Sequence, residues 1–147
     1  MNDLATALRA EVDAAAARLR SMTEAEAARE RGAAKWAKKE ILGHLIDSAA
    51  NNHQRFVRGQ MSGTLITPGY AQEHWVSSQR YGERPWPALV ALWAAYNRHL
   101  AHVLTHLPDT YGSVPVQIGR DAPVTLDFVA RDYVDHLRHH LAQIFAV

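Results

Sequence analysis

Four segments of this chain carry apolar residues three or four positions apart, the spacing that lines one face of an α-helix. The clearest segment covers residues 36–60, and its apolar positions are Ile41, Leu42, Leu45, Ile46, Ala49 and Phe56. Each such helix exposes an apolar face that must be buried against another element. Four of them in one chain are buried most simply against one another, so we predict an all-α protein built as a four-helix bundle.

Capping residues and prolines set the ends of the predicted helices. The helices cover residues 2–21, 36–60, 87–107 and 126 to near the C-terminus. Asn2 or Asp3 is suited to cap the first helix, and Thr125 is suited to cap the last. Pro87 is a favourable first-turn residue for the third helix, which Pro108 ends. The apolar line predicted for the last helix consists of Phe128, Tyr133, Leu137, Leu141 and Ile144.

The segments between the helices are predicted from the glycines and prolines that interrupt regular structure. Residues 61–84 form a long crossover loop broken by Gly63, Pro68, Gly69 and Gly82. Loops of this length usually act as lids or binding loops, and Trp75 gives this one a large side chain to pack. We predict a short helix at residues 71–79 and a partly helical linker at 21–35. Residues 111–124 alternate around a Gly-Arg-Asp turn, which indicates a small hairpin whose pairing its two prolines limit.

Length and composition restrict the class of protein. A chain of 147 residues with 48% hydrophobic content is the size of a single domain, residues 1–147. Its net charge of +1 creates no field that favours nucleic acid or an anionic membrane as a partner. No apolar run approaches the roughly 20 residues that span a bilayer, and the N-terminal residues lack a signal-peptide core. We therefore expect a soluble, cytoplasmic protein. The candidate site described next makes a small molecule its expected substrate.

Three of the nine histidines have the spacing of a metal site. His136 and His140 lie four residues apart, about 40 degrees apart around a helix, as the two histidines of HExxH helices do, although the glutamate of that motif is absent here. His139 is turned roughly 120 degrees away from the apolar line of its helix. His44 lies on the second helix, and facing helices of a bundle can combine their side chains into one site. Because the chain has no cysteine, a metal here is held by imidazole, carboxylate or solvent.

A polar file runs along one edge of the second helix and consists of His44, Ser48, Asn51 and Arg55, flanked by Asp47. Arg55, with its fixed fork of donors, is our candidate for binding a substrate carboxylate, and Asn51 is our candidate for a neighbouring oxygen. Asp47 is the candidate for orienting a ligand imidazole through its second nitrogen.

Structural roles are also compatible with these residues. His44, taken alone, is also compatible with a hydrogen-bonded histidine of the core. Arg55 is compatible with a surface ion pair, and Asp47 with an ordinary position on the helix surface. Trp36 is more typical of a packing anchor than of a catalytic group. The other histidines are not predicted to be ligands, since three of them fall on the outer face of the third helix; they are His53, His74, His99, His102 and His106.

Two strings of the sequence resemble the DinB-like superfamily, and most closely its metal-dependent hydrolase and thiol-transferase branch. They are WAKKEILGHLIDSAANNHQRF, from Trp36 to Phe56, and DYVDHLRHHLAQI, from Asp132 to Ile144. The shared features are a tryptophan before the helix, the H-L-x-D-S segment, an arginine eleven residues after the histidine, and H-x-x-H-H-x-x-Q in the last helix. Their occurrence together and in order is more specific than any one of them.

The resemblance implies a four-helix bundle with a long crossover, and a divalent metal, zinc or nickel, bound by His44, His136 and His140. It also implies that dimers are common, so we expect a homodimer. Three imidazoles leave one position for water or for a low-molecular-weight thiol, which corresponds to a hydrolase or to a thiol S-transferase. The alternative is a non-catalytic bundle that binds a ligand or a partner. DNA repair is disfavoured by the neutral charge and the dispersed basic residues.

Overall fold

The computed structural model describes residues 1–146 and confirms the predicted all-α bundle. Its four long helices are α1 (Asn2–Ser21), α3 (Lys38–Arg58), α5 (Trp86–Thr105) and α6 (Leu126–Phe145). The bounds agree with those predicted from the sequence to within two residues at most ends. None of the helices described is long and apolar enough to cross a membrane.

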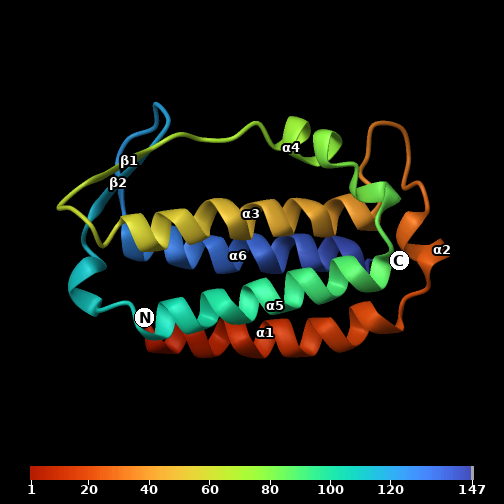
Figure 1. The fold of residues 1–147 in the computed structure, drawn as a ribbon, viewed down its shortest axis with the longest axis horizontal. Coiled ribbons are helices and arrows are strands. Elements are labelled where there is room, and N and C mark those ends of the chain that lie inside the picture. The colour runs from red at the N-terminus through yellow and green to blue at the C-terminus, as the bar shows by residue number, and fades with distance from the viewer. Residues whose placement is uncertain (147) are drawn as a thin grey trace.

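The direction of the helices explains the long crossover. In Figure 1, α1 and α6 run in one direction, while α3 and α5 run in the other. The start of α5 meets the end of α1, where Trp86 Nε1 donates a 2.8 Å hydrogen bond to the carbonyl of Leu19. Because α3 and α5 are parallel neighbours, the chain between them has to return along the whole length of the bundle.

The returning segment and the hairpin form one small sheet. The segment contains β1 (Leu65–Thr67), α4 (Gln72–Gln79) and the 3-10 turn η1 (Tyr81–Glu83), so the predicted short helix is confirmed. After the 3-10 turn η2 (Asp109–Tyr111), the strands β2 (Pro115–Ile118) and β3 (Val124–Thr125) pair antiparallel, which confirms the predicted hairpin. The sequence did not reveal that β1 pairs parallel to β2, with Leu65 opposite Val116. Both of these side chains are buried, which favours the pairing.

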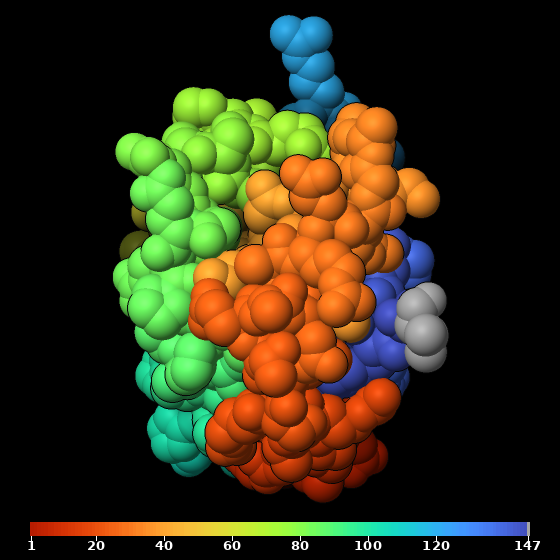
Figure 2. All heavy atoms as spheres, turned by 90° about the vertical axis from the view of Figure 1, so that its right-hand side faces the viewer, coloured from red at the N-terminus to blue at the C-terminus, as the bar shows by residue number. Residues whose placement is uncertain are grey.

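The linker after α1 closes one end of the bundle. It contains α2 (Glu24–Ala28), so the predicted partial helix is confirmed. Thr23 and Glu26 cap this helix through reciprocal side-chain and backbone hydrogen bonds. Lys39 is buried and pairs with Glu24, which ties α2 to the start of α3. Figure 2 views this end, where α2 and the residues after it, in orange, lie over the helix ends.

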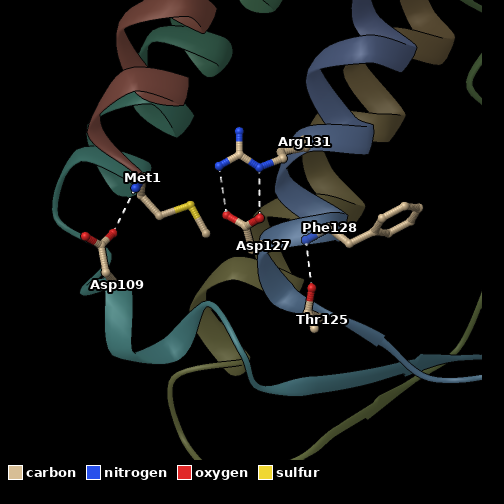
Figure 3. Close-up of polar contacts among 6 residues, drawn as sticks. All are labelled: Met1, Asp109, Thr125, Asp127, Phe128 and Arg131. Carbon is tan, nitrogen blue, oxygen red and sulfur yellow. Dashed lines mark hydrogen bonds and ion pairs between the residues drawn. The ribbon is translucent and has the colours of Figure 1, made fainter.

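The first and last helices begin in different ways (Figure 3). Thr125 caps α6 as predicted, because its hydroxyl accepts a 3.1 Å hydrogen bond from the backbone N–H of Phe128. The predicted cap of α1 is wrong: Asn2 and Asp3 lie inside the helix, and Met1 is the capping residue without a side-chain bond. The Met1 ammonium instead pairs with Asp109 at 2.8 Å, which holds the chain terminus against the loop after α5.

The core consists of apolar side chains from all four long helices, and Trp86, Trp93 and Phe56 are the largest fully buried ones. One member of the line predicted for α6 is wrong, because Phe128 is 53% exposed. It lies about 180 degrees around the helix from Leu137, so it cannot face the same core. Its neighbour Val129 is buried in its place.

Candidate metal centre

Three histidine side chains converge between α3 and α6. His44 comes from α3, whereas His136 and His140 occupy successive turns of α6. One ring nitrogen of each lies within 4.8 Å of the corresponding nitrogens of the other two. The Nε2 atoms of His44 and His136 are 3.1 Å apart. The structure therefore brings together the three residues that the sequence singled out.

Hydrogen bonds made by the other ring nitrogens favour this convergence. Gln143 Oε1 lies 2.8 Å from Nδ1 of His140, so that nitrogen carries the proton and Nε2 keeps its lone pair for the cluster. Ser48 Oγ lies 3.5 Å from Nδ1 of His136, a long contact of the same kind. Nδ1 of His44 is buried without a partner among the described residues. In two of the three imidazoles, a neighbouring side chain thus contacts Nδ1 and leaves Nε2 facing the other histidines.

Electrostatics keep the cluster neutral near pH 7. Burial, together with the neighbouring His136 and His140, lowers the pKa of His44 to about 4. Burial, with His140 and His139 nearby, likewise lowers the pKa of His136 to about 4. The pKa of His140 is also lowered by burial, although its bond to Gln143 opposes the shift. Neutral imidazoles are the form that binds metal ions.

The donor set fits a divalent transition metal. Nitrogens that bind one zinc ion at about 2.0–2.1 Å each can lie no further than about 4.2 Å apart. The 3.1 Å between His44 and His136 falls inside that range, and the other two nitrogen–nitrogen distances are no longer than 4.8 Å, so a shift of at most about 0.6 Å brings all three within it. Two neutral imidazole nitrogens at this distance would repel through their lone pairs unless a proton or a cation lies between them. A single proton satisfies one such pair, whereas a metal ion satisfies three converging nitrogens.

Asp47 is buried beside this cluster rather than on the helix surface. Its Oδ1 accepts a 2.6 Å hydrogen bond from the Tyr81 hydroxyl and a 2.7 Å bond from Nε2 of Gln79. Both donors belong to the crossover segment, so Asp47 fastens that segment to α3. Burial raises the pKa of Asp47, while the two donors act in the opposite direction. Its Oδ2 has no hydrogen-bond partner within residues 1–146.

Trp36 and four further histidines lie outside the set of three possible ligands. The Trp36 ring lies 5.0 Å from the His44 ring, centroid to centroid, and is half-buried, which fits the predicted packing anchor. His53 is half-buried, and its Nδ1 lies 3.0 Å from the Tyr96 hydroxyl. Three histidines of α5 are exposed, as predicted for its outer face: His99, His102 and His106. Among the described residues, none of these four belongs to a cluster of three possible metal ligands.

A small cavity of about 140 Å³ adjoins the cluster on the His136 side. Arg55 lines it and is buried, so the alternative of a surface ion pair is wrong. Asn52 also lines it and accepts a 3.2 Å hydrogen bond from Nη1 of Arg55. Asn51 is not among the cavity-lining residues within the described chain, and its amide donates to the backbone carbonyl of Asp47. The full lining is Ser48, Asn52, Arg55, Tyr70, Ile118, Val124, Phe128, Val129, Asp132, Tyr133 and His136.

The cluster opens on a second side as well. A larger cleft of about 390 Å³ is lined by His140 and Trp36, and also by the basic residues Arg31 and Lys35. The two openings reach different members of the cluster, His136 on one side and His140 on the other. Two separate ligands could therefore approach the same centre.

The comparisons with known proteins agree with this architecture. A model of the DinB superfamily matches residues 7–144, nearly the whole chain. The chain belongs to the DinB superfamily. Its structure is similar to that of YfiT from Bacillus subtilis, described as a probable metal-dependent hydrolase with an unusual four-helix bundle topology. The two share 23% sequence identity and a TM-score of 0.77 over 97% of this chain and 83% of YfiT. No curated protein matches the chain significantly.

Within this member of the DinB superfamily, sequence reasoning missed two residues of the site. Gln143 is three residues after His140 and closes the H-x-x-H-H-x-x-Q pattern, so its spacing was a usable signal. Asn52 lies on the edge of α3 that faces the cavity, whereas Asn51 was predicted there. Helical periodicity finds a polar file, but it does not determine which edge of that file faces α6.

The histidine cluster predicts an acid-sensitive fold. The pKa of about 4 for His44 and His136 lies below the ordinary value of about 6.5. Between these values the unfolded chain binds protons that the folded, metal-free chain does not. The histidine contribution to the free energy of unfolding is therefore complete above about pH 6.5 and is lost as the pH falls towards about 4.

Thermal unfolding of the metal-free protein, followed from about pH 8 to about pH 4.5, measures this effect. The Tm should be nearly constant above pH 7 and should fall below it. The double variant His44→Gln/His136→Gln is the control, because it lacks the two titrating groups. An equally steep fall in the control would contradict the assignment.

Proposed function

We propose that this protein is a metal-dependent hydrolase of a small molecule, with a divalent zinc or nickel ion held by His44, His136 and His140. The observation that carries the proposal is the convergence of three neutral imidazole nitrogens within 4.8 Å. The similarity to YfiT, a probable metal-dependent hydrolase, supports it. A bound divalent metal supplies Lewis-acid chemistry, since it polarises a carbonyl oxygen and makes water more acidic.

The residues of the chain prepare the centre for this chemistry. Gln143 holds the Nδ1 proton of His140 and so directs the other ring nitrogen inward. The cavity beside His136 gives a substrate group access to the centre. Asp47 stays our candidate for orienting His44, although no hydrogen bond joins the two within the described chain, where Asp47 Oδ2 and His44 Nδ1 are both buried without partners. A side-chain rotation that brought this acceptor and this donor together would satisfy both.

A thiol S-transferase is the second candidate, and the two openings of the cluster support it. A transferase needs two organic substrates at one centre, whereas a hydrolase needs one substrate and water. The cleft beside His140 carries the basic residues Arg31 and Lys35 against one acidic residue, Glu73, and this positive balance would attract the anionic groups of a low-molecular-weight thiol. On this proposal the thiol enters by that cleft, and the electrophile occupies the cavity beside His136.

Metal analysis and activity assays test these proposals together. We expect untagged protein to purify with about one zinc or nickel ion per chain, and to hydrolyse members of an ester and amide panel only when loaded with metal. Turnover that appears only after a low-molecular-weight thiol is added would identify the transferase instead. Tight metal binding without turnover in either assay would favour a non-catalytic binding module, and absence of metal above background would refute both enzymes.

A further inference from the structure

Arg55 is a buried charge without a counter-ion. Its side chain is only 9% exposed, yet no ion pair within residues 1–146 includes it. Its recorded hydrogen bond goes to the neutral Oδ1 of Asn52, at 3.2 Å. Burying a guanidinium is costly unless an anion compensates it. Asp132 lines the same cavity and acts on Arg55 electrostatically but forms no ion pair with it, so an anion from outside the chain would complete the compensation.

The cavity in front of Arg55 has the composition of a subsite for an amphiphilic molecule. Its polar wall carries Ser48, Asn52 and Arg55, next to His136 of the metal cluster. Its apolar wall is built from β2, β3 and α6, and Phe128 belongs to this wall. Phe128 is 53% exposed, so part of its ring is free to contact a ligand that enters the cavity.

Asp132 is the other charged residue that lines the cavity, and its negative charge affects which anions can bind there. This residue is exposed to solvent. Burial lowers the pKa of Arg55, whereas Tyr70 and Asp132 partly oppose this. Asp132 repels an anion and Arg55 attracts it, and both effects grow with the charge of the anion, so a second charge on the ligand gains less here than beside an unopposed arginine. The two oxygens of a carboxylate match the planar fork of one guanidinium, so we take a carboxylate as the ligand group.

We propose that this cavity binds the carboxylate of a small organic acid through Arg55 and Asn52, with the apolar part of the acid lying against Phe128. The proposal deepens the function proposed above and rests on it in one respect: the acid is taken to be the substrate of the metal centre. A volume of about 140 Å³ is below the roughly 300 Å³ at which typical ligand pockets begin, so the cavity accepts one end of a small molecule.

Binding of hexanoate to the metal-free protein tests the subsite, because the metal can then contribute nothing to carboxylate binding. We expect Arg55→Gln to weaken hexanoate binding by about tenfold or more, the loss typical of a charge-assisted hydrogen bond. Arg58→Gln is the matched control, since Arg58 is an exposed arginine on the same helix, and it should leave binding unchanged. Hexyl phosphate should bind more weakly than hexanoate. Titrations followed by NMR shifts of Phe128 and Val129 would measure these affinities.

A second variant keeps the test decisive if Arg55→Gln fails to fold. Phe128→Ser replaces an exposed side chain, and it should weaken hexanoate but not acetate. Equal binding of hexanoate by the wild type, Arg55→Gln and Phe128→Ser would overturn the subsite. Metal binding combined with that result would leave the metal-dependent function standing. Conversely, the protein could bind no metal and still bind hexanoate in a way that depends on Arg55. That result would uphold the subsite and refute the proposed metal-dependent function.

Discussion

Replacing His44 or His140 by alanine is expected to lower the affinity for a divalent metal by more than about 100-fold, because hydrogen-bond partners of ligands alone typically account for 10- to 100-fold. Each variant removes one of three converging nitrogens, and the described residues offer no other ligand cluster to replace it. Metal content after purification and competition with a chromogenic chelator measure the change. Loss of hydrolytic activity should follow the loss of metal.

The controls for this prediction lie on the same helix. His139 is exposed and adjacent to His140, yet it is not part of the cluster, so His139→Ala should keep the metal. Gln143→Leu should have an intermediate effect, because it removes the partner of His140 Nδ1 but leaves all three ligands. If His139→Ala were as damaging as His140→Ala, the ligand set would be wrong.

Gly43→Ala is expected to destabilise the protein strongly, although the same change in an exposed helix usually stabilises. A Cβ added at Gly43 would lie 2.6 Å from Cε2 of Tyr81, and closer still to other atoms of that ring. Overpacking of this kind costs about 1–3 kcal/mol or more, which exceeds the gain of up to about 1 kcal/mol from better helix propensity. We expect the Tm to fall by roughly 3–10 °C.

The effect should pass through the crossover segment to the metal site. Displacing the Tyr81 ring also strains its hydrogen bond to Asp47, the residue that fastens the crossover to α3. Gly82→Ala is the control, since a Cβ there meets nothing within 4 Å. In a Tyr81→Ala background, Gly43→Ala should become neutral or stabilising, because the obstructing ring is gone. Equal destabilisation in both backgrounds would place the cause elsewhere.

The four long helices were predictable because each carries a local signal. Apolar spacing, the Thr125 cap and the prolines around α5 act within a few residues, so they can be read from the sequence. The two errors have different causes. At α1 the chain terminus itself occupies the cap position, and Asp109, far along the chain, pairs with its ammonium. The Phe128 error was local, because helical rotation alone places Phe128 about 180 degrees from Leu137.

The sequence by itself determined which residues could form a metal centre. His136 and His140 share a helix face through their spacing, and His44 lies on another helix with a polar edge. Only the tertiary structure decided that α3 packs against α6 in the register that brings the three together. It also decided that Asp47 binds the crossover and that Arg55 is buried without an ion pair among residues 1–146. Helical periodicity is a local property, whereas the contact between two helices depends on how the whole bundle fills its core.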